Sequence, residues 1–422
     1  MSSEMSSQTH RTRATVRHLF AGSNSSVGFY SYYDFLIAPD ATRILFVKGG
    51  PGVGKSTFMR QIGEHFAAQG WPVEYCHCSS DPRSLDGVIF PHAGIALIDG
   101  TAPHMQDPRF PGAVDEIIHL GDFWDEAALM RAKKEIVSLT RQASRLFAQA
   151  YRYLGAARLV LADRETLASA AMDFALVNRW RQQIIHLWQL ESKDATPPLT
   201  ANQSADSSTH ASPSQSVQAG FDHHVPLSGG GTPQSRVRKL FATAITPEGL
   251  KSFLPELFGD ARQRVILQGE PGTGKSTLVA AVAQACTWAG FDVELFYDAL
   301  EPTHPEHLWV PRLNVGLVTS NEYHPFSAKA NDVVLDFNQG LDYTSLASCA
   351  EELEYDRVRF QELLQRGLQS LARAKHVHDD LEAYYVPNMR FSAVEELLDK
   401  TVTRIHHWAE AARKELRCPA NI

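Results

Sequence analysis

The sequence predicts an α/β protein with two P-loop NTPase domains, each with a mostly parallel sheet and an appended α-helical hairpin. The first observation is a Walker A pattern, G-x-x-x-x-G-K-[ST], at residues 49–56 and again at 269–276. The second is that an apolar strand-like run precedes each loop and a helical pattern follows it. The third is a regular alternation of strands and helices, which is typical of parallel sheets.

The two halves of the chain align with each other. Gly269 stands 220 positions after Gly49 (269 − 49 = 220), and the same shift pairs residues 73–74 with 293–294. Further along, the shift falls to 217 and pairs Asp125 with Asp342 (342 − 125 = 217). A period of this length indicates duplication of whole domains, because solenoid repeats are only about 20–50 residues long.

Domain boundaries follow from composition. Residues 1–15 are polar and are expected to be disordered. Residues 192–235 are rich in Ser, Thr, Pro, Gln and Gly, and so few apolar groups cannot offset the entropy of ordering a chain. We expect a flexible linker there, a first domain over 16–191 and a second over 236–422.

The overall composition limits the class of protein. A length of 422 residues with 44% hydrophobic residues suits two ordinary cores, and a net charge of −8 argues against binding nucleic acid by neutralising its phosphates. The five cysteines are odd in number and mostly scattered, which favours a reducing compartment. No run approaches the ~18 apolar residues of a membrane span. The sequence therefore predicts a cytoplasmic protein without a membrane partner.

The elements of each half are expected in the same order. A short helix comes first, over 27–37 and over 248–258. The strands before the loops lie at 44–47 and 265–267. Later strands are expected at 73–77, 95–98 and 116–120 in the first half, and at 293–297, 315–318 and 333–337 in the second.

Long amphipathic helices follow the strands. Apolar residues recur every three or four positions between 136 and 154 and between 360 and 381. A further helix follows each of them, ending near Leu190 and Leu416, so each half is expected to carry a hairpin too long for a simple crossover. These helices are expected to pack on each other or on the sheets, or to form an arm for a protein partner.

The first loop is expected to bind the phosphates of ATP together with Mg²⁺. Its glycines let backbone N–H groups surround the phosphates at a helix N-terminus. Lys55 is expected to reach the β and γ phosphates, and Ser56 to bind Mg²⁺. ATP is preferred over GTP because the chain has no N-K-x-D run. The predicted nucleotide-binding residues are Gly49, Gly50, Gly52, Val53, Gly54, Lys55, Ser56 and Thr57.

Asp99 is expected to orient the metal, because it ends the apolar strand that begins at residue 95. Gly100 follows it, whereas many ATPases place a water-activating glutamate there. A base must then come from elsewhere. The candidates are Asp81 and Asp86, just after the second strand, and His104, which follows Asp99 by five residues (104 − 99 = 5). Each of the three could equally cap a turn or lie on the surface.

The second loop has the same pattern but not the same acid. Its predicted nucleotide-binding residues are Gly269, Gly272, Thr273, Gly274, Lys275, Ser276 and Thr277. Ser276 is expected to bind the metal, but Thr319 stands where the first half has Asp99, and a hydroxyl adds no charge. This site is predicted to bind nucleotide and to hydrolyse it slowly or not at all, unless Asp298 or Glu322 compensates.

The chain resembles an uncharacterised bacterial family of tandem P-loop ATPases. The resemblance rests on the runs KGGPGVGKSTFMRQIG, YCHCSSDPRSLDGV, IALIDGTAPH and PGAVDEIIHLGDFWD, and it covers nearly the whole chain except the linker. It implies ATP binding on a RecA- or kinase-like sheet and implies no particular substrate.

Three functions remain open from the sequence. One is an ATPase that drives a conformational change, with a complete first site and a regulatory second site. Another is a small-molecule or nucleotide kinase, with Asp81 and Asp86 holding the acceptor and Arg141 or Arg145 acting as lid arginines. The third is a non-hydrolysing switch that regulates a protein partner. The two loops could face each other in an intramolecular pseudo-dimer, or each could stand alone.

Overall fold

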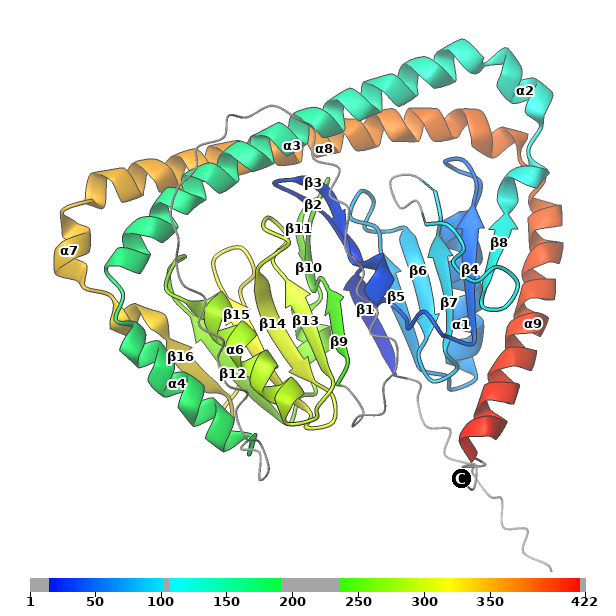
Figure 1. The fold of residues 1–422 in the computed structure, drawn as a ribbon. Coiled ribbons are helices and arrows are strands. Elements are labelled where there is room, and N and C mark those ends of the chain that lie inside the picture. The colour runs from blue at the N-terminus through cyan, green and yellow to red at the C-terminus, as the bar shows by residue number, and fades with distance from the viewer. Residues whose placement is uncertain (1–14, 102–105, 191–234, 418–422) are drawn as a thin grey trace, which may run out of the picture.

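The computed structural model describes residues 15–101, 106–190 and 235–417. Two six-stranded sheets stand side by side, and two long helices run across one end of both (Figure 1). The protein is therefore α/β with two sheet-containing halves. No helix within the described residues is both long and apolar enough to cross a membrane. The predicted disordered N-terminus and linker lie outside these residues, apart from residues 15 and 235.

The first half forms a mixed sheet with the strand order β1-β5-β6-β7-β4-β8. Its strands are β1 (Val16–Phe20), β4 (Arg43–Lys48), β5 (Val73–His77), β6 (Leu85–Phe90), β7 (Ile95–Asp99) and β8 (Asp115–His119). β6 is antiparallel to both of its neighbours, and the other pairs are parallel. The prediction of a mostly parallel sheet missed β6, because this strand is buried on both faces and lacks an alternating pattern.

The second half repeats this arrangement, with the order β16-β12-β15-β14-β13-β9. Its strands are β9 (Val237–Leu240), β12 (Gln263–Gln268), β13 (Val293–Tyr297), β14 (Pro305–Val310), β15 (Val315–Ser320) and β16 (Val333–Asp336). The missed strand β14 is again antiparallel to both neighbours. Helices α1 (Lys55–Ala68) and α6 (Lys275–Trp288) follow the two glycine-rich loops and pack on their sheets.

The segments predicted as short helices before each loop, 27–37 and 248–258, each begin with a strand and end with a short helix. Each contains the second strand of a β-hairpin: β3 (Gly28–Ser31), which follows β2 (Gly22–Ser25), and β11 (Gly249–Ser252), which follows β10 (Thr243–Thr246). Gly28 and Gly249 have φ values of 109° and 108°, which favour a tight turn over a helix. Only η1 (Tyr33–Phe35) and α5 (Leu254–Phe258) are helical. β2 and β10 pair with each other, so both halves share a four-stranded sheet.

A buried ion cluster joins the two halves at the centre of the molecule. Arg17 lies 2.7 Å from Glu74 and 2.6 Å from Glu294. Arg238 lies 2.5 Å from Glu74 and 2.9 Å from Glu294. Each arginine thus contacts one glutamate of its own half and one of the other half. Removing one arginine would leave two buried carboxylates with a single counter-charge, so the cluster favours this one arrangement of the halves.

The long helices of the two halves pair with each other. α3 (Lys133–Ala170) and α8 (Ala350–Tyr385) run side by side in opposite directions (Figure 1). Leu154 packs so closely against Gly367 that a Cβ atom there would lie 2.8 Å from the leucine Cδ2. The predicted hairpin within each half is therefore replaced by a pair between halves. The remaining helical elements are η2 (Leu120–Phe123), α2 (Glu126–Arg131), α4 (Phe174–Leu187), η3 (Phe337–Gly340), α7 (Tyr343–Ala347), η4 (Val386–Asn388) and α9 (Phe391–Arg417).

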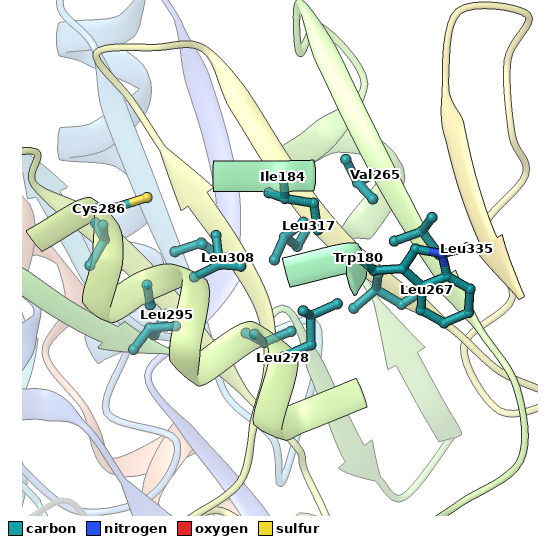
Figure 2. Close-up of a cluster of buried hydrophobic side chains, with 14 of the residues drawn as sticks. Trp180, Ile184, Val265, Leu267, Leu278, Cys286, Leu295, Leu308, Leu317 and Leu335 are labelled. Atoms are coloured by element: carbon teal, nitrogen blue, oxygen red, sulfur yellow. The ribbon is translucent and has the colours of Figure 1, made fainter. Parts of the chain in front are cut away.

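The last helix of each half packs on the sheet of the other half. α4, from the first half, places Trp180 and Ile184 in the core formed by α6, β12 and β15 (Figure 2). α9, from the second half, places Ile405 and Ala409 in the core of the first half. The amphipathic pattern predicted buried helices correctly, but it carries no information about which sheet receives them.

Candidate functional site

The first glycine-rich loop joins β4 to α1 and defines site one. Gly52 and Gly54 have φ values of 67° and 91°, in the left-handed region that glycine adopts without strain. No side chain caps α1, so the N–H groups of its first turn are suited to an anion. Val53 is buried and Thr57 is exposed. The loop thus presents backbone donors at the end of a central strand.

Lys55 and Asp99 meet beside this loop. Lys55 Nζ donates to the carbonyl oxygens of Gly49 and Gly50, at 3.2 and 2.9 Å, and lies 3.7 Å from Asp99 Oδ2. The meeting follows from sheet register, because Asp99 is paired with Val47, two residues before the loop. Asp99 Oδ1 accepts a hydrogen bond from the Thr101 N–H at 2.8 Å, which fixes the carboxylate.

The Ser56 side chain is hydrogen-bonded to the backbone of strand β6. Its Oγ accepts a hydrogen bond from the Leu85 N–H at 2.9 Å, at the start of β6. The hydroxyl is therefore held at the carboxyl end of the sheet, in the first turn of α1, where hard oxygen ligands for a divalent cation are expected.

The three residues predicted as candidate bases lie in different environments. Asp86 lies in β6 rather than in a loop, is buried, and accepts a hydrogen bond from Tyr33 Oη at 2.8 Å. Asp81 caps a turn by accepting from the Arg83 N–H at 3.1 Å, and it lies 3.3 Å from Lys375 Nζ of α8. His104 lies outside the described residues. Neither aspartate is paired with Lys55.

The second half closes over site one. A Cβ atom on Gly50 would lie 2.8 Å from Tyr385 Cε1, and one on Gly52 would lie 2.9 Å from Val386 Cγ2. Gly52 also approaches Glu382, which lies on the last turn of α8. Glycine is needed at these positions because the end of α8 rests on the loop itself.

The second glycine-rich loop, between β12 and α6, defines site two and has left-handed glycines at the same two positions. Gly272 and Gly274 have φ values of 79° and 91°. Lys275 Nζ donates to the carbonyl oxygens of Gly269 and Glu270, at 2.8 and 2.6 Å. Burial lowers the pKa of Lys275 to about 8, so this ammonium group is held where a negatively charged ligand would stabilise it.

Glu306 supplies site two with a carboxylate that sequence reasoning did not select. It is buried and lies close enough to Lys275 for the two charges to interact. Its Oε1 accepts from Asn321 Nδ2 at 3.2 Å, and its Oε2 lies 3.2 Å from Nε2 of the buried His307. Thr319, in the place of Asp99, donates its hydroxyl to the Glu306 carbonyl at 2.8 Å.

The pairing of the halves contained a signal for this carboxylate. A shift of 220 aligns Asp86 with Glu306 (306 − 86 = 220). The same shift aligns Tyr33, which donates to Asp86, with Phe253 (253 − 33 = 220), so the neighbour of Glu306 is His307 rather than a tyrosine from that position. Asp298 and Glu322, which were predicted from the sequence as substitutes for Asp99, do not occupy the position of Glu306. Asp298 accepts from the Leu300 N–H at 2.8 Å and caps a turn, and Glu322 is exposed.

Helices α3 and α4 of the first half close over site two. A Cβ atom on Gly272 would overlap the carbonyl oxygen of Glu165, and one on Gly274 would lie 3.0 Å from Phe174 Cε1. Arg164 Nη2 donates to Glu270 Oε2 at 3.0 Å. The open cavity here measures about 1010 Å³ and is lined by the loop, α3, the ends of β14 and β15, and part of α8. Such a volume is sufficient for a nucleotide.

No protein-family model matches the chain, and neither does any curated protein or solved structure. The informative comparison is therefore internal. Lys375 with Asp81 at site one corresponds to Arg158 with Glu301 at site two. Two long helices thus contact the two sites in the same way, each helix coming from the opposite half.

Proposed function

We propose that this protein binds ATP at both glycine-rich loops and hydrolyses it at site one in a Mg²⁺-dependent reaction, with site two as a regulatory nucleotide site. The observation that carries the proposal is the position of Lys55. Its ammonium group lies over the loop carbonyls, 3.7 Å from the Asp99 carboxylate, at the start of an uncapped helix. This combination of backbone donors, a cation and a strand-terminal acid suits a triphosphate with its metal.

The residues of site one fit both ligands by their chemistry. Lys55 would exchange the loop carbonyls for the β and γ phosphates, since phosphate oxygens are stronger acceptors for an ammonium group. Ser56 and Asp99 offer the oxygen ligands that Mg²⁺ prefers, and the metal would supply charge neutralisation to the transferring phosphoryl group. The chain's own role is then to position the phosphates and hold the charges in place.

The closure of each loop by the opposite half supports a conformational role for the nucleotide. Glu382 and Tyr385 of α8 lie against loop one, and Glu165 of α3 lies against loop two. A ligand entering either loop must therefore displace or engage a helix that spans both halves. This arrangement favours an ATPase or a nucleotide switch over a kinase, because the proposed acceptor residues Asp81 and Asp86 are already paired, with Lys375 and Tyr33 respectively.

The test is phosphate release from Mg-ATP by the full chain. We expect turnover by the wild type, loss of turnover in Lys55→Ala and Asp99→Asn, and altered but measurable turnover in Lys275→Ala. Nucleotide binding without turnover in the wild type would support the non-hydrolysing switch instead. Unchanged turnover in Lys55→Ala would contradict the assignment of hydrolysis to site one.

A further inference from the structure

Arg164 is a charge over site two that has no counterpart over site one within the described residues. It lies on α3, which covers site two, and it is only 7% exposed. The shift of 217 aligns it with Leu381 of α8, over site one (381 − 164 = 217). Leu381 is equally buried, at 7% exposed, so one site has a buried cation where the other has a buried apolar side chain.

The Arg164 guanidinium is only partly satisfied. Its Nη2 is bound to the Glu270 carboxylate, but its Nη1 is buried and has no hydrogen-bond partner of acceptable geometry among the described residues. The Tyr323 hydroxyl lies beside Arg164 and Glu322, and Arg164 and Tyr323 both line the cavity of site two. A buried donor without an acceptor is costly in a protein, so this Nη1 of a guanidinium that lines a cavity indicates a polar ligand there.

The partner that Arg164 does have is exchangeable. The Glu270 side chain is 55% exposed, while Arg164 is 8% exposed in its side chain, so the carboxylate can move into solvent without losing hydration. Glu270 belongs to loop two itself, next to the backbone that Lys275 contacts. A guanidinium at this position is suited to bidentate recognition of phosphate oxygens.

We propose that Arg164 is a phosphate-binding residue of site two, supplied by the first half, which exchanges the Glu270 carboxylate for the terminal phosphate of a nucleoside triphosphate. This inference rests on the proposed nucleotide binding at loop two. It assigns to Arg164 the ability to distinguish ATP from ADP, because the diphosphate has no terminal phosphate to replace the carboxylate. A change in the partner of Arg164 would then act on α3. Because α3 is packed along α8, the change would also act on the C-terminal end of α8, which lies against loop one.

The test measures Mg-ATP and Mg-ADP affinities at site two alone, by calorimetry on the full chain carrying Lys55→Ala. Adding Arg164→Gln is expected to weaken Mg-ATP binding by at least about tenfold, the low end for a charge-assisted hydrogen bond, and Mg-ADP binding by less than about threefold. Arg164→Lys should restore part of the preference for ATP, because it keeps the charge but not the fork of donors.

Two controls separate ligand recognition from folding. Arg152→Gln removes an exposed arginine of the same helix and should leave both affinities unchanged. Arg164→Gln combined with Lys275→Ala should keep the Mg-ATP affinity of site one. Equal losses for Mg-ATP and Mg-ADP, or no loss for either, would overturn the inference while leaving the proposed function intact. If Lys55→Ala binds no nucleotide, the proposed function fails at site two and the inference fails with it.

Discussion

Replacing Trp180 with alanine is expected to destabilise the second half of the molecule, although this residue belongs to the first. Trp180 is 8% exposed and lies in α4 beside Leu267 and Leu335 of the second sheet (Figure 2). Its ring centroid lies 4.9 Å from that of Phe337. Truncating a buried tryptophan removes its transfer free energy and leaves a cavity, which together cost about 3–5 kcal/mol of unfolding free energy.

Urea unfolding with hydrogen exchange resolved by segment would measure this effect. We expect the amides of β12, β15 and α6 to lose protection first, while those of β4 and α1 keep theirs. Trp288 is 69% exposed on α6, so Trp288→Ala is the matched control and should change stability by less than ~0.5 kcal/mol. A cost below ~1 kcal/mol for Trp180→Ala, or earlier loss of protection in the first sheet, would refute the exchange of helices between halves.

Three further predictions concern site two in the Lys55→Ala background. Mg²⁺ should increase the ATP affinity of site two, and Glu306→Gln should reduce that increase about tenfold, because Glu306 is the buried acid near the loop. Calorimetric titrations with and without the metal measure the increase, and an unchanged increase in the variant would exclude Glu306 as a metal ligand. Gly272→Ala should lower the melting temperature, because the new methyl group would overlap the Glu165 carbonyl at a φ of 79°, and an unchanged melting temperature would show that α3 does not press on the loop. Burial lowers the pKa of Lys275 to about 8, and a bound phosphate raises it, so ATP binding at about pH 9 should take up a proton that binding at about pH 6.5 does not. Calorimetry in buffers of different ionisation enthalpy detects that uptake, and equal enthalpies in all buffers at the higher pH would contradict it.

The parts of the site that were predictable are those fixed by one strand and its neighbour. The meeting of Lys55 and Asp99 follows from a loop at the end of one strand and an acid at the end of the adjacent one. Periodicity and flanking turn residues placed β5 and β13 with the observed bounds. β6 and β14 were missed, because buried runs that contain Asp86 or Glu306 lack the apolar continuity expected of a buried strand.

The exchange of helices between the halves could not be read from the sequence. The amphipathic pattern of α4 indicates that one side of the helix is buried. It does not indicate on which sheet, because the two similar sheets offer nearly equivalent surfaces to this helix. What decides is tertiary geometry, because the pairing of α3 with α8 carries each chain segment to the far end of the molecule before its last helix begins (Figure 1). For the same reason Arg164 could not be assigned to site two, which lies in the other half.

The exchange also explains how duplication can produce two different sites. Each loop is encoded in one half but is closed by a helix of the other half, so a substitution in a loop and one in the helix over it lie in separate copies. Site one has Asp99 beneath it and Leu381 over it, whereas site two has Thr319 beneath it and Arg164 over it. The acid suits a site that is proposed to hydrolyse a metal-bound triphosphate, and the added cation suits one that is proposed to bind a triphosphate without hydrolysing it. Exchanging the pair at one site, with Thr319→Asp and Arg164→Leu together, should therefore shift site two towards turnover, and phosphate release from Mg-ATP in the Lys55→Ala background measures the gain. No release by that variant would contradict this division of roles between the copies.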